Sequence, residues 1–429
     1  MNGNMLIKNA AQIATCSGFK AKRGSEMADL GVIADGAVLI EKGLIRSVGR
    51  NEDILREFDA IGDDRKTYDV IDAAGKAILP GFVDSHTHLV FGGYRAEEFG
   101  WRLRGDSYME IMARGGGIVN TVAATREASL EQLIRRGIRR LDSMLSFGVT
   151  TVEGKSGYGL DRPTELKQLQ AMADLDRIHY LDVVPTFLGA HAVPPEYRGA
   201  EDAFIDFMAD KVLPEVAQRK MAEFCDIFCE HKVFSVPQSR RLLGKAKTLG
   251  LKIKLHADEI VSLGGAELAA ELGAASADHL LQASDEGIRQ MAAAGVVATL
   301  LPGTAFSLKE PYARGRFMID HDCAVALASD FNPGSCFSES IPMLVALATL
   351  YMQLTTEEAI TALTINGAAA LDRADSVGSI DRGKAGDMVM LEFPSYHFIP
   401  YHIGVNTVEK VVKRGNLVYD KTEGGIVHC

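Results

Sequence analysis

The stretch FVDSHTHLVF (residues 82–91) begins as an apolar, strand-like run and ends in a His-x-His pair formed by His86 and His88. Side chains two residues apart on a β-strand lie on the same face. We therefore expect both imidazoles to point into one space, where they can chelate a single metal ion. By itself the motif does not distinguish a metal site from a structural or surface pair, because short motifs also occur by chance.

Seven further strand-like runs follow along the chain, separated by segments whose apolar residues recur at the three- and four-residue intervals of amphipathic helices. Eight strands that alternate with helices favour a (β/α)8 TIM barrel, which we place at residues 81–375. The seven runs are TTVEGKSGYG (150–159), DVVPTFLGAH (182–191), FCDIFCEHKVF (224–234), LKIKLHADE (251–259), ASADHLL (275–281), GVVATLLPG (295–303) and CAVALASDFNPG (323–334).

The two ends of the chain differ from this central part. Residues 1–80 contain short alternating segments such as MLIKNAAQIA, separated by Gly and Asp turns, and residues 376–429 contain similar ones such as VEKVVKRGNLVYD. Both read as antiparallel strands. We predict an α/β protein whose two ends combine into one small β-sandwich domain beside the barrel.

Many polar residues of the barrel runs fall at the carboxyl ends of the predicted strands, which is the face where barrel enzymes hold their active sites. The remaining histidines lie outside this pattern, and we interpret them as surface or structural residues. The strand-end set is His86, His88, Glu153, His191, His231, His256, Glu259, His279 and Asp330; the other histidines are His179, His321, His397, His402 and His428.

Two of these residues complete a candidate metal site with the His-x-His pair. His256 follows the apolar run LKIKL, and Asp330 follows the run VALAS. A lone histidine there is more often structural, but an unpaired buried carboxylate is costly unless a cation or donors accompany it. Three imidazoles and one carboxylate, with a position left for water, suit Zn²⁺ or Fe²⁺ and do not suit Mg²⁺ or Ca²⁺.

Candidates for proton transfer lie close to these ligands. Glu259 comes three residues after His256, so it can act as general base and then acid, or it can be a glutamate favoured by a helix N-terminus. Asp258 is the competing carboxylate. His279 can polarise a substrate carbonyl or be a core histidine. Lys155 and Lys232 stay open as modified lysines that would bridge a second metal ion.

Composition narrows the function classes. The chain has 429 residues, of which 47% are hydrophobic, and a net charge of −11, which argues against a nucleic-acid partner. The start lacks the pattern of a secretory signal, and no apolar run reaches the length of a membrane span, so we expect a cytoplasmic protein. The six cysteines have no CxxC spacing, and we expect them to be reduced.

Several motifs resemble a known family. LPGFVDSHTHLVF (79–91) resembles the amidohydrolase superfamily in general. Within it, the chain looks like the imidazolonepropionase family over essentially its whole length. The motifs that carry this narrower resemblance are HTHLVFGGYRAEEF (86–99), GKSGYGL (154–160), TFLGAHAVP (186–194), LHADE (255–259) and SDFNPGS (329–335).

The resemblance implies a function and a site. The function is hydrolysis of the cyclic amide of 4-imidazolone-5-propanoate to N-formimidoyl-L-glutamate in histidine degradation, by a homodimer with one zinc or iron ion per chain. The substrate is a small molecule with a carboxylate tail. The implied metal ligands are His86, His88, His256 and Asp330; the catalytic residues are Glu259, His279 and Asp330; the substrate contacts are Arg95, Tyr158, His191, Glu259, Asn332, Gly334 and Ser335.

Each substrate contact also has a plainer interpretation. Arg95 can be a solvated residue of the charged loop RAEE, Tyr158 can be a core aromatic, and Asn332 can belong to an ordinary Asn-Pro-Gly turn. Two rival functions also stay open. One is a deaminase of a purine or pyrimidine, a neutral substrate with no carboxylate for Arg95 to bind. The other is a hydrolase-like binding protein that has no catalytic activity.

Overall fold

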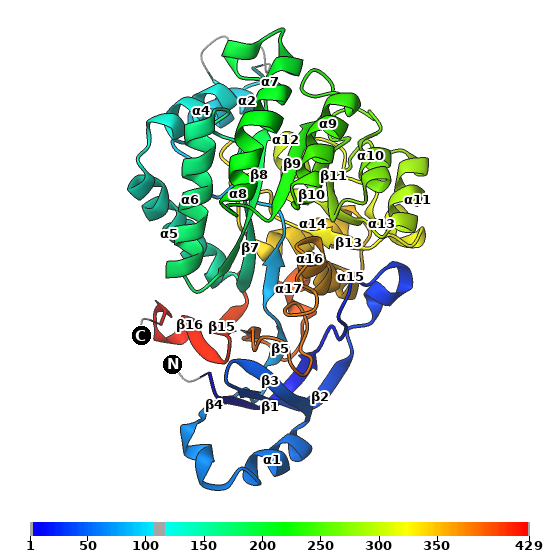
Figure 1. Cartoon of the computed structure of the whole chain (residues 1–429). Helices are drawn as coiled ribbons and strands as arrows, with labels where there is room; N and C mark the ends of the chain where they lie inside the picture. The colour runs from blue at the N-terminus through cyan, green and yellow to red at the C-terminus, as the bar shows by residue number, and fades with distance from the viewer. Residues whose placement is uncertain (1–2, 107–115, 428–429) are drawn as a thin grey trace.

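The computed structural model describes residues 3–106 and 116–427. Eight strands form one parallel sheet in which each strand pairs with its neighbours in chain order. They occupy the runs that the sequence predicted, so the barrel prediction is confirmed (Figure 1). The strands are β6 (Phe82–Asp84), β7 (Val149–Lys155), β8 (Asp182–Ala190), β9 (Phe224–Cys229), β10 (Lys252–Ala257), β11 (Ser276–His279), β12 (Val297–Leu300) and β13 (Val325–Leu327).

Helices follow the strands and cover the outside of the barrel (Figure 1). Their starts are specified locally: Ser129 accepts a hydrogen bond from the Gln132 amide at the start of α5, and Asp161 accepts one from Thr164 at the start of α6. The helices used below are α2 (Ala96–Leu103), α4 (Ile118–Glu127), α5 (Leu130–Ser146), α6 (Arg162–Ile178), α9 (Val236–Thr248), α10 (Gly265–Leu272) and α12 (Pro302–Leu308).

Both ends of the chain contribute strands to a second, nine-stranded sheet below the barrel, with the two termini close to it (Figure 1). Its path runs β17-β16-β15-β14-β5-β1-β2-β3, and β4 pairs with β1. The strands are β1 (Met5–Ala14), β2 (Val32–Glu41), β3 (Leu44–Arg50), β4 (Asp69–Asp72), β5 (Ala77–Pro80), β14 (Met388–Leu391), β15 (Val408–Lys413), β16 (Asn416–Asp420) and β17 (Gly425–Ile426).

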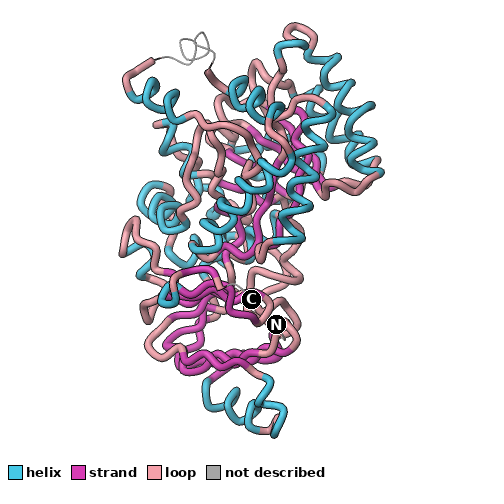
Figure 2. Tube along the Cα trace, turned by 90° about the vertical axis from the view of Figure 1, so that its left-hand side faces the viewer, coloured by secondary structure: helices cyan, strands magenta, loops and turns pink. Residues whose placement is uncertain are grey.

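This sheet curls around its own core, as the strands at the base of Figure 2 show. Val38 and Ile40 of β2 share one buried cluster with Met388 of β14 and Val412 of β15. The expectation of purely antiparallel strands is wrong for two pairs, because β1 runs parallel to both β4 and β5. The connection from β3 to β4 contains α1 (Asn51–Asp59) and a short 3-10 helix (Gly62–Thr67), which let the chain return in the direction of β1, and β5 follows β4 after a short turn.

The cysteines agree with the expectation of reduced thiols. Cys16, Cys225, Cys229, Cys323 and Cys336 are buried and free. Cys429 and His428 lie outside the described residues. Among the helices within residues 3–106 and 116–427, none combines the length and the apolar character that crossing a membrane requires.

Candidate functional site

The His-x-His segment lies directly after β6, where the first and last strands of the barrel meet. The sequence had suggested that the pair forms the end of the strand. β6 ends at Asp84, however, so the pair lies just beyond it. A parallel bridge between Thr87 and Phe331 joins the two strand extensions. The Asp330 amide donates to the His86 carbonyl at 3.0 Å, and the His88 amide donates to the Phe331 carbonyl at 2.9 Å. The barrel closure therefore sets His86 and His88 beside Asp330.

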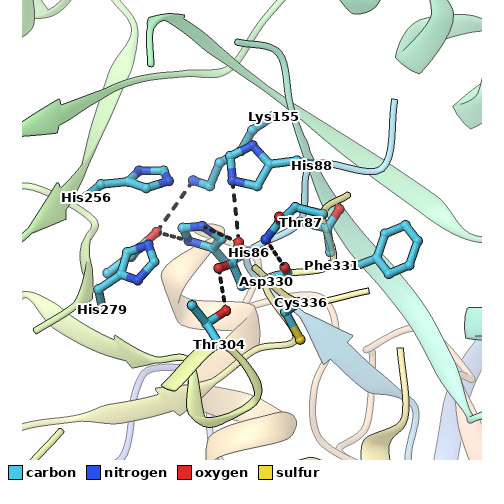
Figure 3. Close-up of polar contacts among 12 residues, drawn as sticks. His86, Thr87, His88, Lys155, His256, His279, Thr304, Asp330, Phe331 and Cys336 are labelled. Carbon is cyan, nitrogen blue, oxygen red and sulfur yellow. Dashed lines mark hydrogen bonds and ion pairs between the residues drawn. The ribbon is translucent and has the colours of Figure 1, made fainter. Parts of the chain in front are cut away.

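The predicted ligands surround one space at this end of the barrel. Figure 3 shows the imidazoles of His86, His88, His256 and His279 gathered near Asp330. Nε2 of His86 and Nε2 of His88 lie 3.6 and 3.5 Å from Oδ1 of Asp330. Candidate ligand atoms lie within 4.8 Å of one another in four overlapping sets: His86, His88 and Asp330; His86, His256 and His279; His88, His191 and His256; and His86, Glu153 and Asp278.

The polar atoms of this space fit a bound cation. Within the described residues, His86 Nε2, His88 Nδ1, His256 Nε2 and His279 Nδ1 are buried without a hydrogen-bond partner. Nδ1 of His256 makes no aligned hydrogen bond either, but it lies 2.9 Å from Oδ2 of Asp226. An unsatisfied buried polar group costs about 1–3 kcal/mol, and a metal ion would remove that cost. Burial lowers the pKa of His86, His88 and His256 well below its usual value, which keeps the imidazoles in the neutral form that binds metals.

Asp330 is held rigidly at the edge of the site. The Thr304 hydroxyl on α12 donates to Oδ2 of Asp330 at 2.6 Å. The backbone of Asp330 has a φ of 49°, a left-handed conformation that is strained for a residue with a side chain. Burial raises the pKa of the Asp330 carboxyl to about 7. A cation beside this carboxyl would offset the cost of its negative charge.

The structure separates the two carboxyls that follow His256. Asp258 accepts backbone N–H groups from Leu263, Gly264 and Gly265 at one oxygen and from Ala266 at the other, at 2.8 to 3.1 Å. Its carboxylate is therefore occupied at the start of α10. Glu259, in contrast, has an oxygen 3.5 Å from Nδ1 of His279 and a partly exposed side chain. Burial and the charges of Asp330, Glu230 and Glu310 raise the pKa of Glu259 to about 8.

Arg95, Tyr158 and His191 lie next to the imidazole cluster. The His191 ring stacks on His88, with centroids 4.9 Å apart, and its centroid is 5.3 Å from that of Tyr158. Burial raises the pKa of Tyr158, and the positive charge of Arg95 acts against this rise. Arg95 is the residue before α2, and its Nε donates to Oε2 of Glu98 at 2.9 Å. Glu98 thus holds the guanidinium of Arg95 close enough to Tyr158 and His191 to affect the pKa of both.

The turn after β13 supports the plainer interpretation of Asn332 and a specific use of Gly334. Nδ2 of Asn332 donates to the Asp330 carbonyl and to the Ser335 hydroxyl, and its Oδ1 accepts from the amides of Gly334 and Ser335. These side chains hold the turn together. A Cβ atom added to Gly334 would lie 2.3 Å from Nη1 of Arg95, so only glycine lets the guanidinium approach the backbone here.

The structure also reveals a set of buried charges that the sequence reading left unconnected. Lys155, Lys254, Glu153, Asp226 and Asp278 have side chains with 0% exposure, inside the barrel. Asp226 in FCDIFC and Lys254 in KIKLHA are charges in the middle of apolar strands, which is the signal that could have found them. Lys232, the other candidate bridging lysine, lies in an exposed turn after β9.

Lys155 is unsuited to the role of a modified, metal-bridging lysine. Its Nζ lies 2.7 Å from Asp226, 3.0 Å from Glu153 and 3.4 Å from Asp278. Burial lowers the pKa of Lys155, but the three carboxylates outweigh burial and raise it above its usual value. The ammonium form does not react to a carbamate, and an added negative charge would meet three others.

Known proteins are similar to this chain in sequence and in architecture. The profile of the amidohydrolase family matches residues 69–126 and 112–419. An imidazolonepropionase of Clostridium tetani is 61% identical over 420 residues, which cover 98% of this chain and 99% of the relative. The chain belongs to the imidazolonepropionase family. The family's member from Parabacteroides distasonis is also 61% identical, over 97% of this chain and 99% of its own length.

A solved structure agrees with the fold of this family member. An adenosine deaminase from Xanthomonas campestris with bound zinc superposes with a TM-score of 0.70 at 17% identity, over 99% of this chain and 94% of the deaminase. The resemblance inferred from the sequence is confirmed by the family profile and by the two relatives at 61% identity. The buried imidazoles and Asp330 form a donor set that could hold a metal ion.

Proposed function

We propose that this chain hydrolyses the cyclic amide of 4-imidazolone-5-propanoate to N-formimidoyl-L-glutamate. The observation that carries the proposal is that Arg95 and Glu259 lie beside one buried cluster of imidazoles with Asp330. Membership of the imidazolonepropionase family supports the same reaction. The site has donors for a metal, a carboxyl that can move a proton, and a cation for a carboxylate tail, which are the groups that this reaction needs.

We propose His86, His88, His256 and Asp330 as the ligands of one zinc or iron ion. Their donor set is neutral imidazole plus carboxylate, which suits either metal. When bound, such an ion polarises a carbonyl and lowers the pKa of water. A second ion would need a modified lysine as a bridge. Lys155 is held in ion pairs, and no other buried lysine of the described residues lies at a strand end beside these ligands, which supports a single ion.

The proton transfers are assigned to Glu259. In its ionised form, Glu259 removes a proton from water as the water oxygen forms a bond to the ring carbonyl carbon. The bond between that carbon and the ring nitrogen then breaks, and Glu259 returns the proton to the departing nitrogen. Burial keeps the pKa of His279 at about 4, so this imidazole is neutral and can donate a hydrogen bond to the oxyanion. Asp330 can share the proton transfer as a metal ligand.

Arg95 is assigned to the propanoate of the substrate. A guanidinium binds a carboxylate with two charge-assisted hydrogen bonds, and the Arg95 guanidinium is held through its Nε by Glu98. Tyr158 and His191 complete this pocket with a hydroxyl and an imidazole. Gly334 and Ser335 line it through their backbone, and Asn332 holds the turn that carries them.

Replacing Arg95 by Met tests this assignment. We expect KM for imidazolonepropanoate to rise by about 10- to 100-fold, because a charged hydrogen-bonding partner contributes about 1.5–3 kcal/mol. The readout is the loss of substrate absorbance at several substrate concentrations. The Gly334→Ala variant should raise KM in the same direction, since its Cβ displaces the guanidinium without removing it. An unchanged KM in both variants would remove Arg95 from the substrate pocket.

The same assay separates this function from its rivals. A deaminase of a neutral purine or pyrimidine would release ammonia from that base, and its KM would be indifferent to Arg95. A binding protein without chemistry would turn over neither compound when loaded with zinc or iron. Turnover of imidazolonepropanoate alone is the result that supports the proposal. A cytoplasmic location and a homodimer stay predictions.

We expect metal binding at pH 6 to release at least about one proton per chain, and the number of protons released to be smaller at pH 8.5. Without the ion, burial places the pKa of Asp330 at about 7, so below this pH the carboxyl must lose its proton to become a ligand. The imidazoles are already neutral at pH 6 and release none. Affinity should therefore rise with pH up to about 7.

Isothermal titration with Zn²⁺ in two buffers of different ionisation enthalpy measures the protons released. The Glu259→Gln variant serves as the control, because it removes another carboxyl beside the site whose pKa is raised. Proton release that is absent at pH 6, or an affinity that falls as the pH rises, would contradict a role of Asp330 as ligand.

A further inference from the structure

The interior of the barrel holds a set of buried acidic and basic side chains beside the ligand cluster. We call Lys155, Lys254, Glu153, Asp226 and Asp278 the interior ion network; all five side chains have 0% exposure. Replacement of a buried ion pair by apolar residues is often neutral or stabilising, so such a network is not explained by stability alone. Its contacts with the site indicate another use.

Two carboxylates of the network contact imidazoles of the ligand cluster. Oδ2 of Asp278, on β11, lies 2.6 Å from Nδ1 of His86 in a hydrogen bond. Oδ2 of Asp226, on β9, lies 2.9 Å from Nδ1 of His256, while its Oδ1 accepts the His256 amide at 3.1 Å. A carboxylate on one ring nitrogen leaves the other nitrogen to face a metal.

One lysine connects these two carboxylates. Lys155 ends β7, and its Nζ lies 2.7 Å from Oδ2 of Asp226 and 3.4 Å from Oδ2 of Asp278. These are the same oxygens that contact His256 and His86. Figure 3 shows Lys155 reaching toward the imidazoles from behind His88.

The second lysine of the network has different partners. Nζ of Lys254 donates to the Ser85 carbonyl and to Oε2 of Glu153, both at 2.8 Å. It lies 3.8 Å from Oδ2 of Asp278, outside hydrogen-bond distance, and no contact with Asp226 is found in the described part of the chain. Lys254 is thus an equally buried ammonium that lacks the direct link to both imidazole-contacting carboxylates.

We propose that Lys155 is a positioning residue of the metal site, which holds Asp226 and Asp278 so that His256 and His86 present their other ring nitrogens to the ion. This inference rests on the proposed ligand set but not on the proposed substrate. Lys155 touches neither ion nor substrate in this scheme. It acts through two carboxylates that come from different strands and would otherwise repel each other.

The test compares Lys155→Met with Lys254→Met in the full-length chain. Zn²⁺ affinity is measured by competition with a chromophoric chelator at constant pH. We expect about 10- to 100-fold weaker binding for Lys155→Met and less than about threefold for Lys254→Met, because loss of a group that orients metal ligands has an effect of the larger size. Melting temperatures of the metal-free variants report the structural cost, which should be similar for the two.

Two results would overturn the proposal: Lys155→Met with native affinity, or an equal loss of affinity in the two lysine variants. If Lys155→Met does not fold, the isosteric variants Asp226→Asn and Asp278→Asn replace it. Native Zn²⁺ affinity in both would also overturn the proposal. The affinity assay contains no substrate, so a failure of the proposed reaction shows only in the turnover assay and stays distinguishable from a failure of this inference.

Discussion

The Glu259→Gln variant is expected to lower kcat for imidazolonepropanoate by about 10²- to 10⁴-fold, the usual contribution of a positioned acid–base group. Glutamine keeps the size of the side chain but cannot accept the proton from water or return it to the ring nitrogen. Glu259 lies 3.5 Å from His279 at the edge of the ligand cluster, and no other carboxyl of the described LHADE segment is free for this role. Loss of substrate absorbance under saturating substrate measures kcat.

Asp258→Asn is the matched control, one residue away. Asp258 accepts four backbone N–H groups at the start of α10, so its substitution removes part of a helix cap, worth about 0.5–2 kcal/mol. We expect a lower melting temperature and a kcat that changes much less than in Glu259→Gln. Metal content is measured in both variants. A metal-loaded Glu259→Gln protein with undiminished kcat would remove Glu259 from the proton transfers.

Removal of the metal ion is expected to reduce turnover to background. Without the ion, the site has neutral imidazoles and a carboxyl that is largely protonated at pH 6, and none of these activates water strongly. The measurement is turnover after dialysis against a chelator, followed by addition of Zn²⁺ or Fe²⁺ in separate samples. The ion that restores the higher kcat, together with the metal found in the purified protein, decides between zinc and iron.

Stability provides a second readout of metal removal. A ligand at 1,000 times its Kd stabilises the folded state by about 4.1 kcal/mol, so the melting temperature should rise when metal is added back. His256→Ala is the variant that should lose this response, because it removes one of the proposed ligands. Full turnover by chelated protein that contains no measurable metal would contradict the proposed chemistry.

Local sequence patterns were sufficient to predict the barrel. Each of the eight apolar runs became a strand of the parallel sheet, because short, strongly apolar segments between helices have few other ways to bury both faces. The position of His256 and Asp330 at strand ends followed from the same patterns. Pairing partners were less predictable: the parallel pairs of β1 with β4 and β5 depend on how the chain returns over the small sheet.

Sequence spacing could not choose between neighbouring candidates. Asp258 and Glu259 are equally close to His256 along the chain, and only the turn into α10 directs the first to backbone amides and the second toward His279. Asn332 was similarly open, and its amide group is used within its own turn. In both cases the backbone conformation decides which partner a side chain reaches.

The stretch FVDSHTHLVF by itself indicated the first barrel strand and, after it, a pair of histidines that share one space. The alternation of side chains along a strand and the periodicity of helices are local, so the sequence by itself also determined the strand count and the strand-end residues. The interior ion network was decided by tertiary structure alone. His86 and Asp278 are 192 residues apart, and Lys155 lies 71 and 123 residues from Asp226 and Asp278. These contacts exist because closing the barrel brings distant strands together, and no local pattern encodes that distance.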